Sequence, residues 1–482
     1  MARKRKYLFS VVMCLYNVEK YLDEAISSIV NQTIGFREHI QLILVNDGSK
    51  DSSGMICRKY QEKYPNNIIV IETENRGVSN ARNTGFKYVR GKYVNFADSD
   101  DKWEADAFEK VLSFFNNNDG QIDIVSCRMR YFDRINGFSN GLDYKFSQTR
   151  VIDIAKEPSC LLQHIGPTIF RTKAVKKYSF DVNLIFGEDI DYNTKVLFNK
   201  QKYGVLREAV YNYRRRSDNT ALSDQYLTNP VHFVDVPKKF LMKYHDDAVR
   251  RFGNCIPYVQ HMIMYDLQFR LCAPVPDGVD EAHRAEYRQI IISLLQSIDD
   301  AVITSQRYIK TEEKIFALSL KHGFNIMAQT MIRNHVVFYG NLPVFDLSYH
   351  LFIDDVSFEN DTIKINGFHE YNLVKEGFEV YMHTQDGNVY PLHTHKTDAY
   401  DKIAFDGTVI RRGAAFSVSI PRRGGTPVEF VLKENETEIT IINPSFYKYQ
   451  IVYLNRDGVS CLKRDNITAF VQQRKVTFSK EG

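Results

Sequence analysis

The chain has 482 residues, of which 44% are hydrophobic and 25% are charged. This is the composition of an ordinary globular protein, and the length predicts about three domains. The formal net charge of +4 is small and evenly distributed, which argues against a nucleic-acid partner. The basic start, Arg3–Lys6, is interpreted as a solvated tail, with contact to an anionic lipid surface as the alternative.

Seven cysteines are scattered along the chain without a C-x-x-C pair. Such usage favours reduced thiols in the cytoplasm. No signal peptide is recognised, and no apolar run reaches the roughly 18 residues of a membrane span. We therefore expect a cytoplasmic protein whose membrane contact is at most peripheral, on the inner face of the plasma membrane. A homo-oligomer is compatible with the sequence.

The first quarter of the chain alternates short apolar runs with segments of helical periodicity. Strands are predicted at residues 8–14, 40–46, 68–71, 92–97 and 122–129, with helices between them. Asn17 is predicted to cap the first helix, whose apolar residues recur every three or four positions from Val18 to Val30. Alternating strands and helices predict an α/β fold with a mostly parallel sheet.

The remainder of the chain changes pattern twice. Apolar spacing is helical over residues 225–345, and period-two alternation dominates residues 350–480. Asp386-Gly387 predicts a hairpin turn between two of these strands. We therefore expect three parts, namely an α/β domain (1–225), a helical segment (226–345) and an all-β, sandwich-like domain (346–482).

Five segments of the first half place polar residues directly after predicted strands or at the starts of predicted helices. These segments are Tyr16-Asn17, Asn46-Asp47-Gly48-Ser49, Asn80-Ala81-Arg82-Asn83, Asp98-Ser99-Asp100-Asp101 and Gly187-Glu188-Asp189.

Tyr16 and Asp47 follow the first two strands. Ligands of open α/β sheets bind at the carboxyl ends of the strands. Asp47 is therefore a candidate for hydrogen bonds to a base or ribose, and Tyr16 for stacking on the base. The alternative is that Asp47-Gly48-Ser49 is an ordinary strand-to-helix turn.

Arg82 lies in the first turns of a predicted helix, near Asn80 and Asn83. A diphosphate requires cationic and amide donors, and arginine supplies several in a fixed fork. The alternative is an arginine on the surface of a helix.

Asp98 and Asp100 follow the fourth strand, two residues apart, so both carboxylates are predicted to point the same way. Two such carboxylates suit a hard divalent cation, which would bridge the phosphates of a nucleotide. An acidic loop that caps the next helix is the alternative.

Glu188 and Asp189 open an amphipathic helix after Gly187. A carboxylate at this position is a candidate general base for an incoming hydroxyl group. The alternative is an acidic pair that is favoured only by the helix dipole.

Taken together, these segments resemble the inverting family 2 glycosyltransferases with the GT-A fold, over about residues 7–225. The resemblance implies that Tyr16, Asp47, Asn80 and Arg82 bind the nucleotide, and that Asp98 contacts the ribose or diphosphate. It further implies Asp100 as chief ligand of a divalent metal (Mn²⁺ or Mg²⁺), and Asp189 as catalytic base with Glu188 beside it. The donor would be a UDP-sugar.

The sequence departs from the family pattern at two positions and in one motif. Cys14 replaces the usual proline before the Tyr-Asn pair, and Asn46 replaces the first aspartate of the D-D-G-S turn. The Q-x-x-R-W box of processive synthases is absent, which argues against membrane-embedded chain extrusion.

The β-rich tail is similar to modules of wall teichoic acid and capsule glycosyltransferases, which implies a polyanionic or polysaccharide acceptor. Arg214, Arg215 and Arg216 are candidates for contacting such an acceptor, or form a solvated basic turn. Two other functions stay open. A nucleotidyltransferase lacks support because no glycine-rich phosphate loop with its lysine occurs. A non-catalytic carbohydrate-binding scaffold would not need the acidic residues.

Overall fold

The computed structural model describes residues 7–138, 141–217, 230–307, 309–324, 326, 330–333, 336–346, 350–359, 361–371, 378–421, 428–434, 437–446, 451–454, 460–464, 467–472 and 475–480. The basic Arg3–Lys6 segment lies outside them. The chain forms two compact units. Unit 1 comprises Met1–Tyr265 and Pro276–Ser297, and unit 2 comprises Asp266–Val275 and Ile298–Gly482. The helical segment contributes to both units, and the expected boundaries near residues 225 and 345 stay predictions.

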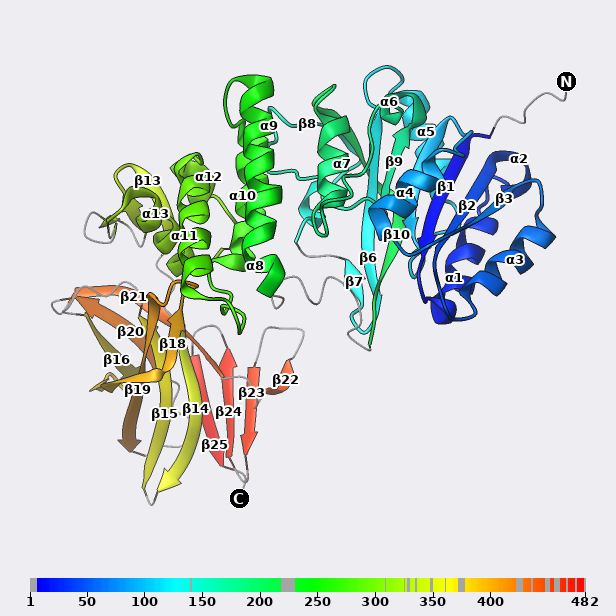
Figure 1. Cartoon of the computed structure of the whole chain (residues 1–482). Helices are drawn as coiled ribbons and strands as arrows, with labels where there is room; N and C mark the ends of the chain where they lie inside the picture. Colours follow the sequence, from blue (N-terminus) through cyan, green and yellow to red (C-terminus); the bar gives the residue numbers. More distant parts are fainter. Residues whose placement is uncertain are drawn as a thin grey trace, which may run out of the picture. The chain divides into compact units, whose positions relative to one another are not determined.

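A mixed sheet forms the centre of unit 1 (Figure 1). The strand order is β3 (Ile68–Thr73), β2 (Ile40–Asp47), β1 (Phe9–Leu15), β4 (Tyr93–Asp98), β9 (Thr168–Arg171), β6 (Ile124–Asp133), β10 (Lys202–Arg215) and β5 (Lys102–Trp103). The first four strands are mutually parallel, β9 is antiparallel to both its neighbours, and β10 is parallel to β6. The expected α/β fold is confirmed, and the carboxyl ends of β1, β2 and β4 meet at one edge.

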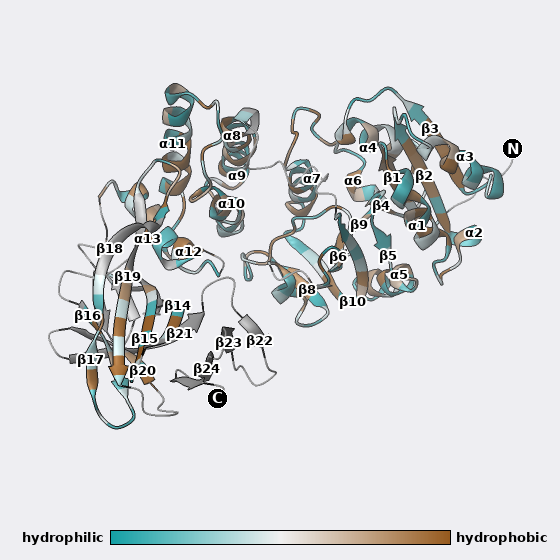
Figure 2. Cartoon of the chain, turned by 90° about the horizontal axis from the view of Figure 1, so that it is seen from below, coloured by the Kyte–Doolittle hydropathy of each residue, from teal (hydrophilic) through white to brown (hydrophobic). Residues whose placement is uncertain are grey.

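The sheet forms where the sequence has its apolar runs. Every residue of β2 is buried, and Figure 2 shows hydrophobic residues along β1 and β2. The connecting helices are α1 (Glu19–Val30), α2 (Phe36–His39), α3 (Ser53–Lys63), α4 (Val78–Phe86) and α5 (Ala107–Asn117). Gly85 lets α4 approach the sheet closely, because a Cβ atom there would lie 2.5 Å from Val12 and 2.9 Å from Val45.

The predicted cap of the first helix is wrong. Helix α1 has Val18 at its N-cap position, without a side-chain hydrogen bond. Asn17 lies one residue earlier with a φ of 52°, and its side-chain oxygen accepts a hydrogen bond from the backbone N–H of Lys50. The Asn17 side chain therefore bonds to the loop after β2 and does not cap the helix, as the sequence pattern had predicted that it would.

Further elements of unit 1 lie beside this sheet or follow it. They are η1 (Asp143–Phe146), α6 (Thr172–Val175), α7 (Glu188–Leu197), α8 (Pro230–Val236), η3 (Pro237–Leu241), α9 (Met242–Phe252), α10 (Pro257–Arg270, whose last turn belongs to unit 2) and α11 (Glu281–Gln296). Two short strands, β7 (Gly137–Phe138) and β8 (Arg150–Asp153), belong to the sheet itself, where they pair antiparallel with β6 and β10. The expected helical middle segment is therefore confirmed.

After Ile298, unit 2 contains α12 (Asp300–Thr304) and α13 (Thr311–His322), and the elements described after them are strands. A three-stranded sheet comprises β11 (Thr330–Arg333), β12 (Val336–Tyr339) and β13 (Leu342–Asp346), at the end of the segment expected to be helical. The larger sheet system contains β14 (His350–Glu359), β15 (Thr362–Tyr371), β16 (Phe378–Thr384), β17 (Val389–Pro391), β18 (His393–Ile403), β19 (Val409–Pro421), β20 (Val428–Glu434), β21 (Thr437–Phe446), β22 (Ile451–Leu454), β23 (Ser460–Arg464), β24 (Ile467–Gln472) and β25 (Lys475–Lys480).

The β part of unit 2 encloses its own core. Ile365 and Phe416 from β15 and β19 share this core with Met382 and Phe430 from β16 and β20. The predicted hairpin is present, since β16 pairs antiparallel with β17 across a turn in which Gly387 has a φ of 85°. No helix among the described residues has the length and apolarity required to cross a membrane.

Candidate active site

A buried arginine connects three of the predicted carboxylates. Nη1 of Arg82 donates hydrogen bonds to Oδ1 of Asp189 at 2.7 Å and to Oε1 of Glu188 at 3.1 Å. Its Nη2 donates to Oδ1 of Asp98 at 3.1 Å. The Arg82 side chain is only 5% exposed, so these ion pairs form largely out of water. The arginine after β3, the aspartate at the end of β4 and the acidic pair opening α7 therefore form one cluster.

The backbone at Gly187 brings the acidic pair into this cluster. Gly187 has a φ of 83° and occupies the N-cap position of α7. A Cβ atom there would lie 2.4 Å from the ring of Phe240, so a side chain is excluded both by conformation and by space. A second contact holds the segment that precedes α7. The Asn83 side chain donates to the backbone oxygen of Phe180 and accepts from its N–H, both at 2.9 Å.

Burial changes the protonation of the cluster. The pKa of Glu188 is raised to about 8 by burial and by the charge of Asp189, against the opposing effect of Arg82. Burial likewise raises the pKa of Asp98 to about 6, with Arg82 lowering it and Asp189 and Asp100 raising it. Glu188 is therefore mostly protonated at neutral pH. The thiol of Cys14 in the same region has its pKa raised to about 12 by burial, so it stays neutral.

Asp189 has a second hydrogen-bond donor. Its Oδ2 accepts a long hydrogen bond, 3.3 Å, from the backbone N–H of Ile165. This contact places the loop before β9 against the acidic pair. A carboxylate held from both sides on the first turn of a helix has a defined direction, as a general base requires.

Asp47 organises the loop that precedes α4. It is buried, and its carboxylate accepts hydrogen bonds from the backbone N–H of Gly77 at 2.9 Å, the N–H of Arg76 at 3.1 Å and the hydroxyl of Thr73 at 3.0 Å. Asn80 donates to the carbonyl of Arg76 in the same loop, at 2.8 Å. The aspartate and Asn80 thus shape the predicted nucleotide site through the backbone.

Tyr16 differs from these residues in being exposed. The side chain is 46% accessible, directly after β1. An exposed aromatic ring at the carboxyl edge of the sheet is available for stacking, as the predicted contact with a base requires. The direct contacts of Tyr16, Asp47, Asn80 and Arg82 with a nucleotide stay predictions.

The predicted metal ligands bind two different arginines. Asp98 pairs with Arg82, whereas Oδ2 of Asp100 accepts from Nε of Arg216 at 2.7 Å. Within the described ranges, no group of three or more His, Cys, Asp or Glu side chains could hold a metal ion. In this arrangement, the described residues therefore offer a cation at most two carboxylates. This donor set fits Mg²⁺ or Mn²⁺ only together with phosphate oxygens and water, which is how such ions are commonly bound beside nucleotides.

The three consecutive arginines have different environments. Arg214 pairs with Glu24 and Asp133, and Arg216 pairs with Asp100. Arg215 lies over the rings of Tyr131 and Tyr213, and its Nε is buried without a hydrogen-bond partner among the described residues. The charge of Arg215 is therefore the one of the three that these ion pairs do not neutralise.

Two features of the site have no clear sequence signal. One is the backbone N–H of Ile165, which any residue could supply. The other is a hollow beside the same loop that contains Lys145 and His164. A lone lysine and a lone histidine are too common in sequences to be recognised as site residues, and their burial is visible only in the structure.

The α/β fold and this site are those expected of a glycosyltransferase, and comparisons with known proteins agree. Residues 10–179 match the model of glycosyl transferase family 2. The chain is 35% identical to the minor teichoic acid biosynthesis protein GgaB of Bacillus subtilis, over 99% of this chain and 53% of GgaB. With GgaA of the same organism it is 32% identical, over 62% of this chain and 68% of GgaA.

A solved structure shows the same fold. The crystal structure of S. aureus TarS matches with a TM-score of 0.50 and 16% identity, over 98% of this chain and 85% of that one. The chain belongs to glycosyl transferase family 2 and has the GT-A fold. It spans about half the length of GgaB.

Proposed function

We propose that this glycosyltransferase transfers a sugar from a UDP-sugar to a hydroxyl group of a cell-envelope glycopolymer of the teichoic acid or capsule type, with inversion. The observation that carries the proposal is the cluster in which Arg82 joins Asp98 to Glu188 and Asp189. A site for a diphosphate and a site for a base must be adjacent in such an enzyme, because the anomeric carbon lies between leaving group and nucleophile.

In this proposal, the donor binds at the carboxyl edge of β1, β2 and β4. Tyr16 stacks on the base, and the loop held by Asp47 and Asn80 surrounds the nucleotide. Asp98 and Asp100 would hold Mn²⁺ or Mg²⁺ together with the diphosphate, and the ion would neutralise charge on the departing UDP. Arg216 contacts Oδ2 of Asp100 in this structure, so a cation held by that oxygen would have to displace the arginine.

Asp189 acts as the base. It takes the proton of the acceptor hydroxyl while the hydroxyl oxygen forms a bond to the anomeric carbon. The bond from that carbon to the diphosphate oxygen breaks on the opposite face, so the configuration inverts. Burial and the charge of Asp189 raise the pKa of Glu188, and a protonated Glu188 adds no second negative charge beside the proposed base.

The acceptor is proposed from the relatives. GgaB and GgaA are named for teichoic acid biosynthesis, and teichoic acids are polyanions. Arg215 is our candidate to contact such a polymer, because the ion pairs of Arg214 and Arg216 leave its charge unneutralised. We further propose that the enzyme acts in the cytoplasm, where the basic start would allow peripheral contact with the membrane. A homo-oligomer is compatible with this proposal.

The test is a donor panel assayed with and without a polymeric acceptor. We expect slow release of UDP from one UDP-sugar alone, and faster release when a poly(polyol phosphate) is added. A carbohydrate-binding scaffold would release no UDP. A nucleotidyltransferase would exchange pyrophosphate instead. Either of these results would overturn the proposal.

A further inference from the structure

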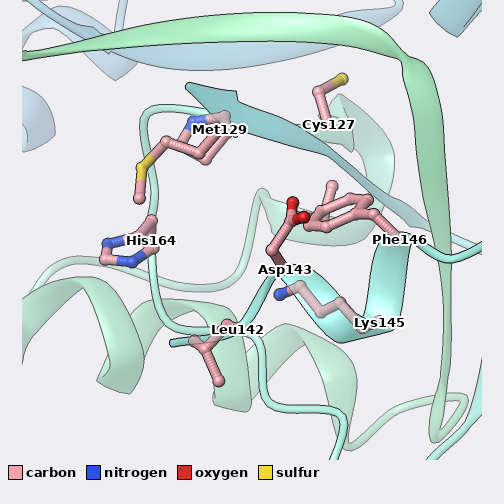
Figure 3. Close-up of a pocket in the computed structure, with 9 residues that line it drawn as sticks. Cys127, Met129, Leu142, Asp143, Lys145, Phe146 and His164 are labelled. Atoms are coloured by element: carbon pink, nitrogen blue, oxygen red, sulfur yellow. The ribbon is translucent and has the colours of Figure 1, made fainter. Parts of the chain in front are cut away.

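A small, solvent-open hollow in unit 1 is lined by residues of β6, of η1 and of the loop before β9 (Figure 3). His164 lines it, and the next residue, Ile165, donates its backbone N–H to Asp189. The ring of His164 also lies 6.4 Å from that of Tyr213, which immediately precedes Arg214 on β10. The hollow is therefore next to the proposed base.

The hollow contains a buried cation without an ion-pair partner in the described part of the chain. Lys145 is 3% exposed, and Figure 3 shows its ammonium group directed into the hollow, with His164 on the opposite wall. One hydrogen bond is described for it, from Nζ to the carbonyl oxygen of Leu161 at 2.6 Å. An ammonium group can donate three, so two donors remain for a ligand.

The other charged groups of the hollow cancel. Asp143 lines it too, but Arg128 neutralises this carboxylate through two hydrogen bonds, at 2.7 and 2.6 Å. Burial lowers the pKa of His164 to about 4, so its ring is neutral at physiological pH. Burial also lowers the pKa of Lys145 to about 8, which leaves the amine mostly charged at neutral pH. With Asp143 already paired to Arg128, Lys145 carries the one charge of these groups that no described ion pair neutralises.

The remaining walls are largely apolar, with Met129, Leu142 and Phe146 among them. Binding sites for small ligands commonly combine apolar walls with a few placed polar groups. One positive charge among apolar walls matches a single anionic group carried on a short carbon chain. A lysine is a common point-charge partner of phosphate.

We propose that this hollow is the subsite for one phosphodiester group of the acceptor, held by Lys145 next to the hydroxyl group that Asp189 deprotonates. The inference rests on the proposed function, because it assigns the acceptor side of that same site. The acceptor would be a polyol phosphate, and Lys145 would recognise it by its charge. Lys145 is then a specificity residue that takes no part in the chemical step.

The test compares two acceptors in full-length protein. One is a short polyol phosphate oligomer, and the other is the same polyol without phosphate. For Lys145→Met we expect the KM for the oligomer to rise roughly 10- to 100-fold, as for loss of a charge-assisted hydrogen bond. The kcat, the KM for the neutral polyol and acceptor-free release of UDP should not change. Lys156→Met, at an exposed lysine nearby in the chain, is the matched control.

Two results would overturn the inference. One is an unchanged KM for the oligomer in Lys145→Met. The other is an equal loss with both acceptors, which would show that Lys145 only supports the fold. If Lys145→Met does not fold, Lys145→Gln replaces it, because glutamine retains an N–H for Leu161 and removes the charge.

A direct binding measurement separates this inference from the proposed function. Calorimetric titration of the oligomer into wild-type protein and Lys145→Met requires no turnover. Binding to wild type that is weakened in the variant supports the subsite even if no sugar is transferred. Transfer by wild type together with equal oligomer affinity in both proteins would retain the function and refute the subsite.

Discussion

The guanidinium of Arg82 lies 2.7 Å from the carboxylate of Asp189, although 107 positions separate the two residues in the chain. The same side chain reaches Asp98, which ends β4. One buried cation thus connects the strand edge where a diphosphate is expected with the helix start where a base is expected. Replacing Arg82 therefore tests the contribution of this cluster to stability, and replacing Asp189 tests its contribution to catalysis.

Replacing Arg82 should destabilise the protein strongly. Arg82→Met leaves Asp98, Glu188 and Asp189 without their shared cation in a buried site, and breaking a buried ion pair typically costs about 3–5 kcal/mol. Urea unfolding measures the loss. Arg58→Met is the control, because the Arg58–Glu72 pair is 60% and 49% exposed and should contribute under about 1 kcal/mol. Equal losses in both variants would contradict a central role for Arg82.

Asp189→Asn should slow turnover by about two to four orders of magnitude with donor and acceptor saturating, because asparagine cannot accept the proton. Donor affinity, measured by titration, should change little. Asp191→Asn is a matched control, since Asp191 lies on the same helix and pairs with Lys195 and Lys243. Near-normal turnover of Asp189→Asn would exclude it as the base, and lost donor affinity with an intact fold would assign it to the donor site.

The pH dependence of stability should report Glu188. Its pKa is raised from 4.5 to about 8 in the folded protein. Between these pH values the unfolded chain releases the proton while the folded protein keeps it, so rising pH favours unfolding. Glu188→Gln cannot titrate. We therefore expect wild type to lose stability relative to this variant from pH 4.5 to 8, measured by denaturant unfolding at several pH values. A constant difference over that range would show that the pKa is not raised.

Asp100→Ala should abolish transfer in the presence of Mn²⁺ and weaken donor binding, because the cation and the diphosphate are proposed to bind together. Asp119→Ala, at a residue whose side chain is 76% exposed, should behave like wild type. The assay is UDP release with Mn²⁺, with Mg²⁺ and with a chelator. Wild-type activity that is as high in chelator as in Mn²⁺ would refute the proposed dependence on a metal ion.

The two compact units predict where the chain can be divided. A protein ending at residue 297 contains all of unit 1, including the acidic cluster and the hollow with Lys145. We expect it to fold and to release UDP from the donor, while its affinity for a polymeric acceptor falls. Circular dichroism, UDP release and polymer binding test this. An insoluble fragment, or one with unchanged polymer affinity, would argue against a separate binding module in residues 298–482.

The sequence alone determined the α/β class, the approximate strands of unit 1 and the segments that carry the site. Apolar runs such as residues 42–45 define strands locally, because the middle of a strand buried on both faces needs no polar residue. The five polar segments were recognisable because they follow strands or open helices in the same order as in the family pattern that they resemble. The cap at Asn17 was wrong, because a contact with Lys50, 33 residues away, replaced a local one.

Only the tertiary structure decided which partners these side chains have. Asp98 and Asp100 are neighbours in sequence, yet they pair with Arg82 and Arg216, which lie 16 and 116 positions away. Whether an arginine such as Arg215 keeps its charge available depends on which carboxylates the fold brings near it. The buried ammonium of Lys145 carries no local pattern either. Burial and long-range pairing set the charge of each group, and both arise from packing between elements that the sequence orders but does not place.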